Sequence, residues 1–396
     1  MRRTSLLLPA LAVALTACSD PSPGPETRTE SLNASIANPS AGGTSVYWNR
    51  VARDLVGKYR SNAFEAIRGY AILSVAQYNG IIAAAKASPD GAEASARAAV
   101  SGASAVALTY LYPTEAAALE ALVVALGKSS GGPHDDAAEA AGRAAAERIV
   151  ARARNDNFFE PWTGTVPVGP GLWFSSAIPP LPPLGARFGQ ARTFLLRSGA
   201  QFRPPPPPAF GSPQFVSALA EVRRISDTRT EEQLASAVFW AFPAGTYTPG
   251  GYWNAEASRL AVQYDLREIE SAHLLALMNM VGFDAIVASH DAKFTYWSIR
   301  PTQADPDITL AIGLPNFPSY PSNHASLSSS MATILGSRFP AEKARLDALA
   351  QQAALSRLFG GIHYRFDCVT GLRLGRMVAE WGLQHDVVGQ RPFLFD

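Results

Sequence analysis

The segment at residues 62–85, NAFEAIRGYAILSVAQYNGIIAAA, constrains the fold most strongly. Its apolar residues cover nearly the whole circumference of a helix, which is typical of a helix buried on all sides rather than one lying at a surface. Alternating strand patterns are scarce in the rest of the chain. The sequence therefore predicts an all-α body.

Further helices are predicted on both sides of this segment. The pattern is helical from Trp48 onward, and proline and glycine residues separate the stretches that follow. The expected helices span residues 92–110, 113–126, 135–153, 213–225, 230–242, 254–281, 324–339, 341–357 and 365–384. We expect them to form two packed helical bundles.

Residues 158–213 differ in character, because they contain the proline runs IPPLPPLG and RPPPPPAFGSP, in which a helix cannot persist. Phe202 and Phe210 flank the second run and favour a rigid strap packed across the helical body. A polyproline ligand for a partner domain is the alternative.

The first residues predict export. Arg2 and Arg3 precede an apolar run at residues 6–15 that is too short to span a bilayer. The sequence LTAC, ending at Cys18, resembles the lipobox of bacterial lipoproteins, in which the cysteine is lipidated; a plain secretory signal is the alternative. We expect a signal peptide at 1–18, a flexible linker at 19–45, and one helical domain at 46–396 with its catalytic part at about 216–390. The predicted location is the bacterial cell envelope, on the outer membrane or the periplasmic side, with the lipid as the only membrane contact.

Charge and cysteine content exclude some classes of protein. The formal net charge is +1, which provides no basic field for nucleic acid. Cys18 and Cys368 are the only cysteines, and the first is expected to carry lipid, so no intrachain disulfide is predicted. The oligomeric state is left open.

The first block that carries chemistry is KFTYWSIRP. Lys293 and Arg300 are seven residues apart, close to two helical turns, so both cations share one face if the helix continues to Pro301. Such a pair standing alone would indicate only a solvated stripe.

The second block, PSNH, opens a helix with Ser322 as its N-cap. A helix N-terminus offers unpaired N–H groups and the positive end of the dipole, so an anion can bind there, with the Ser322 hydroxyl and the Asn323 amide directed at it. His324 follows at once and is expected beside that anion.

The third block is SRLFGGIHYRFD. Arg357 ends one helix, and His363 lies four residues before Asp367, one helical turn away on the same face. A carboxylate there can hold the imidazole in one tautomer and leave the far nitrogen free to attack or to ligate.

In this order the three blocks resemble the signature of the type 2 phosphatidic acid phosphatase and vanadium haloperoxidase superfamily. The helical body and the proline strap are more loosely similar to its bacterial haloperoxidase-like branch. Two positions depart from the pattern: Asn323 stands where the superfamily usually has glycine, and His290 stands where haloperoxidases commonly have tryptophan. The match consists of Lys293, Arg300, Pro301, Pro321, Ser322, His324, Ser356, Arg357, His363 and Asp367.

The resemblance implies a cage for phosphate or vanadate. It assigns oxyanion binding to Lys293, Arg300, Ser322, Asn323 and Arg357, and catalysis to His324, His363 and Asp367. As a vanadate-dependent haloperoxidase, our first interpretation, the enzyme would use His363 to ligate vanadium and would oxidise halide with hydrogen peroxide.

Two alternatives stay open. As an acid phosphatase without a cofactor, the enzyme would hydrolyse phosphomonoesters or lipid phosphates through a phosphohistidine at His363. The third interpretation is a catalytically silent envelope lipoprotein. Zinc is not predicted, because His134, His273 and His385 have no partners at ligand spacing and are interpreted as surface or core histidines.

Overall fold

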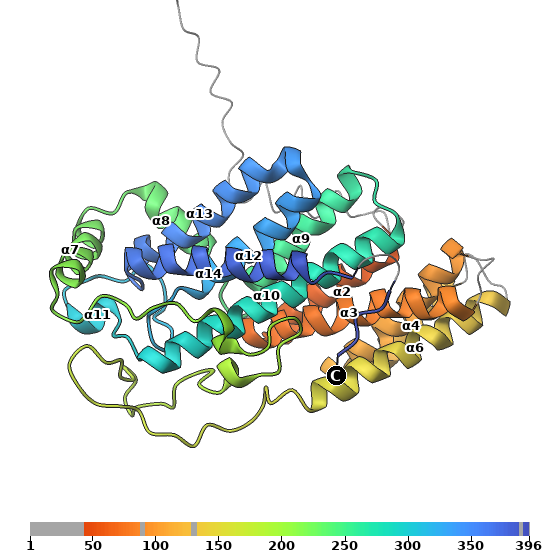
Figure 1. Cartoon of the computed structure of the whole chain (residues 1–396), viewed down its shortest axis with the longest axis horizontal. Helices are drawn as coiled ribbons and strands as arrows, with labels where there is room; N and C mark the ends of the chain where they lie inside the picture. The colour runs from red at the N-terminus through yellow and green to blue at the C-terminus, as the bar shows by residue number, and fades with distance from the viewer. Residues whose placement is uncertain (1–42, 88–91, 128–132, 388–390, 396) are drawn as a thin grey trace, which may run out of the picture.

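The computed structural model describes residues 43–87, 92–127, 133–387 and 391–395. The predicted signal peptide with Cys18, and nearly all of the predicted linker, lie outside these residues. Within them the fold is helical, with isolated β-bridges and no strand. The α-helices shown in Figure 1 are α2 (Thr44–Lys58), α3 (Ala63–Ala87), α4 (Ala92–Leu111), α5 (Ala116–Gly127), α6 (Pro133–Arg154), α7 (Pro213–Asp227), α8 (Glu231–Phe239), α9 (Thr248–Gln263), α10 (Glu268–Tyr296), α11 (Pro301–Ala304), α12 (Asn323–Arg338), α13 (Lys343–Phe359) and α14 (Arg365–Gln384).

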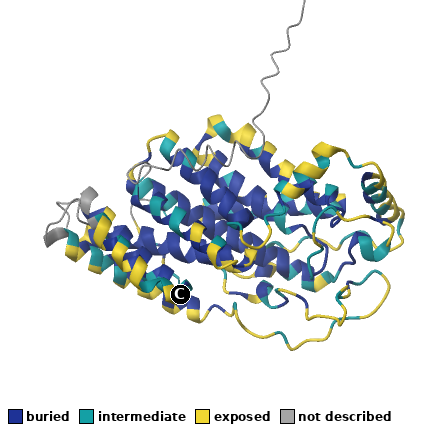
Figure 2. Ribbon diagram, turned by 180° about the vertical axis from the view of Figure 1, so that it is seen from behind, coloured by how far each residue is buried: buried dark blue, intermediate teal, exposed yellow. Residues whose placement is uncertain are grey.

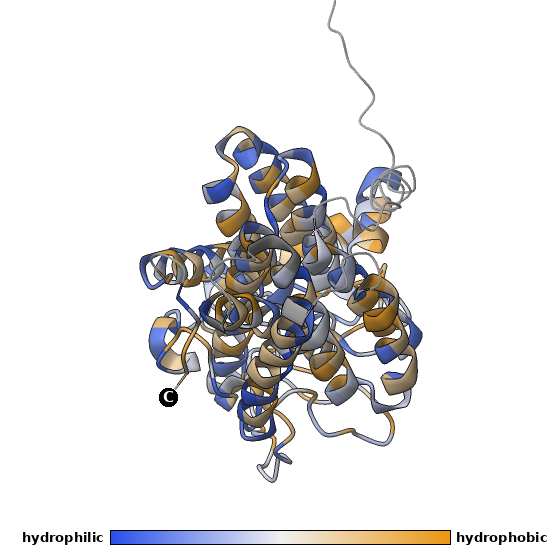
Figure 3. Ribbon diagram, turned by 90° about the vertical axis from the view of Figure 1, so that its right-hand side faces the viewer, coloured by the Kyte–Doolittle hydropathy of each residue, from blue (hydrophilic) through white to orange (hydrophobic). Residues whose placement is uncertain are grey.

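Two groups of helices pack against each other. α3, α4 and α6 form one group, α10, α12, α13 and α14 form the other, and α3 contacts α10 at the junction. One cluster of buried apolar side chains runs through both groups, as the dark-blue interior in Figure 2 shows. Seen from the end in Figure 3, the outer helices carry both hydrophilic and hydrophobic residues, as helices that bury one face do. The predicted all-α fold of packed bundles is confirmed.

α10 lies between the two groups, because it packs against α3 of the first group and against α12 and α14 of the second. It is long and apolar enough to cross a membrane, but 94% of its most apolar 18-residue stretch is buried inside the protein, which is the pattern of a core helix. It ends at Tyr296, because Trp297 adopts the left-handed conformation with φ 49°. The helix therefore does not continue to Pro301, and the expectation that Lys293 and Arg300 share one helical face is wrong.

Glycines allow α12 and α14 to approach closely. A Cβ added at Gly375 would lie 2.1 Å from the carbonyl oxygen of Ser326, and one added at Gly371 would lie 2.6 Å from that of Ser322. α12 begins within the second sequence block, and α14 begins within the third. Their close packing brings these two blocks together.

Residues 155–212 form a strap along the helical body, with only short 3-10 turns. Asp284 of α10 accepts hydrogen bonds from the backbone N–H groups of residues 194–196 at 2.7–2.9 Å. The hydroxyls of Tyr296 and Tyr320 donate to the carbonyl oxygens of Pro204 and Pro205 at 2.6 and 2.7 Å. The proline run is thus tied to the first sequence block and to the residue that precedes the second, as a packed strap requires.

The single helix predicted at residues 254–281 is wrong. α9 ends at Gln263, and the chain turns through Asp265, with φ 48°, before α10 begins at Glu268. No glycine or proline marks this turn in the sequence. The other predicted helices are present, with small differences at their ends.

Candidate active site

His363 and Asp367 form a buried, oriented pair. His363 Nδ1 lies 2.8 Å from Asp367 Oδ2, and the side chains are 3% and 0% exposed. The same oxygen accepts from the Ser319 hydroxyl at 2.5 Å and from the Tyr364 backbone N–H at 3.1 Å. The bound carboxylate places the imidazole proton on Nδ1 and leaves a lone pair on Nε2. The predicted pair forms, but His363 precedes α14, so the turn before the helix makes the contact rather than a helical turn.

Arg300 donates to the other nitrogen of that imidazole. Its Nη1 lies 3.1 Å from His363 Nε2 and 2.7 Å from the carbonyl oxygen of Ile362, and its Nε donates to the carbonyl of Phe317 at 3.0 Å. Its Nη2 is buried and has no hydrogen-bond partner among the residues that the structure describes. Buried polar atoms are nearly always partnered, so this unpartnered cationic donor marks a place that suits an anion.

Lys293 makes contacts that the motif does not predict. Its buried Nζ donates to the carbonyl oxygens of Pro318, Ser319 and Pro321 at 2.9, 2.7 and 2.6 Å. These bonds use all three N–H groups of the ammonium and fix the loop that carries PSNH. Direct binding of an oxyanion by Lys293 stays a prediction, since one of these bonds would have to be exchanged.

The end of α8 lies against His324 and Arg357. His324 Nε2 lies 2.8 Å from the carbonyl oxygen of Trp240, and Arg357 Nη2 donates to that of Ala237 at 2.9 Å. A carbonyl can only accept, so His324 carries its proton on Nε2 and its lone pair on Nδ1. No sequence pattern marks these two contacts, because a backbone carbonyl has no side-chain signature.

The PSNH block places Ser322 and Asn323 at the start of α12. Ser322 is the N-cap, as predicted, with its Oγ accepting from Ala325 N–H at 3.5 Å. The Asn323 carboxamide contacts Ser289 Oγ at 2.7 Å and His290 Nε2 at 2.9 Å. The two positions that depart from the superfamily pattern therefore touch each other.

Desolvation keeps the site imidazoles of His290, His324 and His363 neutral. It lowers the pKa of His290 to about 3 and lowers the pKa values of the other two well below the usual range. Repulsion from the neighbouring cations adds to each shift: Lys293 acts on His290, and Arg300 on His363. His324 is partly exposed, because it faces a cavity, and for it the desolvation is aided by the charge of Arg357.

Burial also acts on the charged groups of the site. It lowers the pKa of Arg300 to about 10 and that of Arg357 to about 9, and it lowers the pKa of Lys293. It raises the pKa of Asp367 to about 6. Both arginines therefore remain cationic at neutral pH, and an anionic ligand would relieve the energetic penalty of their burial.

A cavity of about 330 Å³ opens onto these groups. Asn323, His324, Arg357 and His363 line it, whereas Lys293, Arg300 and Ser322 are not among its lining residues. The remaining wall is largely apolar and comprises Ala63, Phe64, Ile67, Leu184, Ala241, Ile286, Ile312, Phe317, Leu327 and Ile362, with several prolines. The cavity thus combines a polar end with a wall that suits a small organic group.

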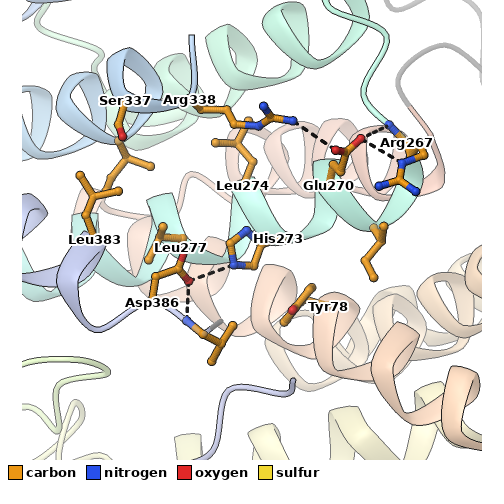
Figure 4. A pocket seen from close by; sticks show the side chains of 13 residues that line it. Tyr78, Arg267, Glu270, His273, Leu274, Leu277, Ser337, Arg338, Leu383 and Asp386 are labelled. Carbon is orange, nitrogen blue, oxygen red and sulfur yellow. Dashed lines mark hydrogen bonds and ion pairs between the residues drawn. The ribbon is translucent and has the colours of Figure 1, made fainter. Parts of the chain in front are cut away.

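A second cavity of about 510 Å³ lies near the start of α10, and none of the motif residues lines it. Figure 4 shows His273 directed at Asp386, with Nε2 2.9 Å from Oδ1, and Glu270 paired with Arg267 and Arg338. His273 therefore has a carboxylate partner that spacing does not reveal. His385 is exposed and stacks on Trp381, and the side chain of His134 lies outside the described residues.

A neutral imidazole oriented by a carboxylate, with a guanidinium group at its other nitrogen, is an arrangement that suits an oxyanion. A family model described as the PAP2 superfamily matches residues 273–385, which contain all the motif residues. The matched segment carries the three blocks, and the match supports the superfamily that they predict.

Solved structures with this fold cover most of the chain. The crystal structure of a bacterial vanadium-dependent iodoperoxidase matches with a TM-score of 0.76 and 21% identity, over 87% of this chain and 95% of the other. A structure of an apo-type bacterial vanadium-dependent chloroperoxidase matches with a TM-score of 0.65 and 15% identity, over 81% of this chain and 94% of the other. A structure of a holo-type bacterial vanadium-dependent chloroperoxidase matches with a TM-score of 0.64 and 14% identity, over 82% of this chain and 92% of the other. At these identities the likeness shows the fold. No match was found among curated proteins.

Proposed function

We propose that this protein is a haloperoxidase that binds vanadate and oxidises halide with hydrogen peroxide. The observation that carries the proposal is the buried Nη2 of Arg300, which has no partner among the described residues, next to a neutral His363 whose Nε2 lone pair accepts from Nη1 of the same guanidinium group. The fold supports it, since similar solved structures are those of vanadium-dependent peroxidases.

Export and lipidation at Cys18 are part of the proposal, and a Cys18→Ala variant that still incorporates radiolabelled palmitate would contradict the anchor.

The donors present fit vanadate. Arg300 Nη1 would exchange its bond to His363 Nε2 for an oxygen of the anion, so that His363 Nε2 would face vanadium. Arg300 and Arg357 would then bind the oxygens, each charge-assisted hydrogen bond contributing about 1.5–3 kcal/mol. Bound vanadate would supply a Lewis-acidic centre that activates hydrogen peroxide. The protein's own contribution is to hold the anion away from bulk water and to accept a proton from peroxide at His324 Nδ1, the free nitrogen of that ring.

Phosphomonoester hydrolysis is the second candidate, and the apolar wall of the cavity favours it. A phosphoryl group at His363 would place an apolar alcohol against that wall. His363 Nε2 would form a bond to phosphorus while the phosphorus–oxygen bond breaks, and the leaving oxygen would take a proton from His324. The dianionic phosphate would raise the pKa of His324 and so allow it to carry that proton.

One pair of assays separates the two candidates. Purified protein is tested for bromination of a dye with peroxide and bromide, before and after vanadate loading, and for hydrolysis of a chromogenic phosphate ester without vanadate. We expect vanadate-dependent bromination that is lost in His363→Ala and kept in Asp386→Asn, which alters only the second cavity. Vanadate-independent bromination, or hydrolysis that requires His363 with no bromination, would contradict the first proposal.

A further inference from the structure

A chain of hydrogen bonds connects the strap to the candidate site through His290. His290 Nδ1 lies 3.0 Å from the carbonyl oxygen of Gly185, and its Nε2 lies 2.9 Å from Asn323 Nδ2. On the far side of the carboxamide, Ser289 Oγ lies 2.7 Å from Asn323 Oδ1.

The direction of every bond in this chain follows from its first member. The Gly185 carbonyl can only accept, so His290 carries its proton on Nδ1 and its lone pair on Nε2. That lone pair must receive an N–H, which places the amide nitrogen of Asn323 towards His290. The amide oxygen then faces Ser289, whose hydroxyl donates.

The surroundings of His290 hold the ring in one orientation. The side chain is 0% exposed, and its ring centroid lies 4.6 Å from that of Phe64 and 5.5 Å from that of Phe317. Gly185 has φ +70°, and a Cβ there would lie 2.9 Å from His290 Cε1. The strap therefore approaches the ring as closely as only glycine permits.

The consequence reaches the cavity, because Asn323 lines it. The amide nitrogen has two hydrogens, and His290 accepts one of them, which leaves one for a ligand. The reverse orientation would turn the carbonyl oxygen of Asn323 to that position and repel an anion.

We propose that His290 is a positioning residue of the oxyanion site, which orients the Asn323 carboxamide so that a bound anion meets an N–H donor rather than a carbonyl oxygen. This inference rests on the proposed function, since it concerns the same anion. It assigns a role to the two positions that depart from the superfamily pattern.

The test is the dissociation constant for orthovanadate, measured by calorimetry at neutral pH in buffer free of phosphate. Asn323→Gly removes the donor and should weaken binding about tenfold. His290→Phe keeps an aromatic ring but removes the acceptor, and should weaken binding by a similar factor. His290→Gln can again donate to Gly185 and accept from Asn323, so it should restore most of the affinity.

The double variant His290→Phe, Asn323→Gly decides between positioning and a merely structural role. If His290 acts through Asn323, the double variant binds as Asn323→Gly does; additive losses would overturn the inference. Equal affinity of Asn323→Gly and the parent would also overturn it, even if His290→Phe does not fold. His273→Phe, in the second cavity, is the matched control and should bind as the parent. A parent that binds neither orthovanadate nor phosphate overturns the proposed function itself, and this inference with it.

Discussion

Replacing Asp367 with asparagine should disable the oriented imidazole of the site. In the protein, Oδ2 of Asp367 accepts from His363, Ser319 and Tyr364, while Oδ1 is buried and finds no partner in the described part of the chain. Asparagine has one acceptor oxygen, so its NH₂ group must either occupy the unpartnered position or face His363. The first arrangement buries an unpaired donor, and the second forces the imidazole proton onto Nε2, the atom expected to contact the anion.

The size of the effect follows from the role of the carboxylate. Loss of a carboxylate that supports a ligating histidine typically lowers affinity about 10–100-fold, which is roughly 1.4–2.8 kcal/mol. Asparagine also removes a negative charge beside Lys293 and Arg300, which by itself favours anion binding, so the expected loss lies towards the lower end of this range. Calorimetric titration with orthovanadate gives the affinity, and thermal melting verifies that the variant is folded.

Asp386→Asn is the matched control for this experiment. It breaks the His273–Asp386 pair, whose separation of 2.9 Å is close to that of His363 and Asp367, in the cavity away from the motif residues. We expect parental affinity in this variant. A folded Asp367→Asn protein that also binds orthovanadate as the parent does would refute the role given to the pair.

Three further predictions concern packing, charge and pH. Gly375→Ala should destabilise the protein by about 1–3 kcal/mol in urea unfolding, because its Cβ would lie 2.1 Å from Ser326 O, whereas Gly313→Ala meets nothing within 4 Å and should be neutral; equal midpoints would contradict the close helix packing. Arg300→Lys keeps the charge but loses Nη2, so orthovanadate affinity should fall about tenfold, and no change would contradict an anion at that nitrogen. The site imidazoles have folded pKa values below the unfolded value of about 6.5, so they contribute stability that is present above that pH and lost as pH falls. The pKa of Asp367 is raised to about 6, so this carboxyl group changes the stability with pH in the opposite direction. Because we expect the imidazoles to dominate, urea stability should be lower at pH ~5 than at pH ~7. The reverse trend would contradict the burial of the imidazoles as neutral rings.

The local part of the site could be predicted from sequence. The N-cap at Ser322 follows from residue type and position alone, and the contact between His363 and Asp367 follows from their short separation. The second contact forms although the expected helical geometry is absent, because any tight turn brings residues so close in sequence within reach.

The tertiary part could not be predicted in the same way. The carbonyl oxygens around Lys293 and the Trp240 carbonyl at His324 belong to backbone that has no distinguishing sequence, and only the fold places them there. The turn through Asp265 likewise contains no glycine or proline, so the helical spacing of apolar residues predicts one continuous helix where the structure has two. The contact between His290 and Asn323 joins two positions 33 residues apart on different helices, which periodicity within one helix cannot reveal.

The central claim is that one tetrahedral oxyanion binds at His363 between the arginines. A crystal structure of the protein soaked with orthovanadate, with anomalous scattering to locate vanadium, measures this directly. We predict a single vanadium peak adjoining His363 Nε2, with Arg300 Nη2 turned towards its oxygens. Vanadium bound elsewhere, or no peak at this site in protein that is saturated with orthovanadate, would contradict the account.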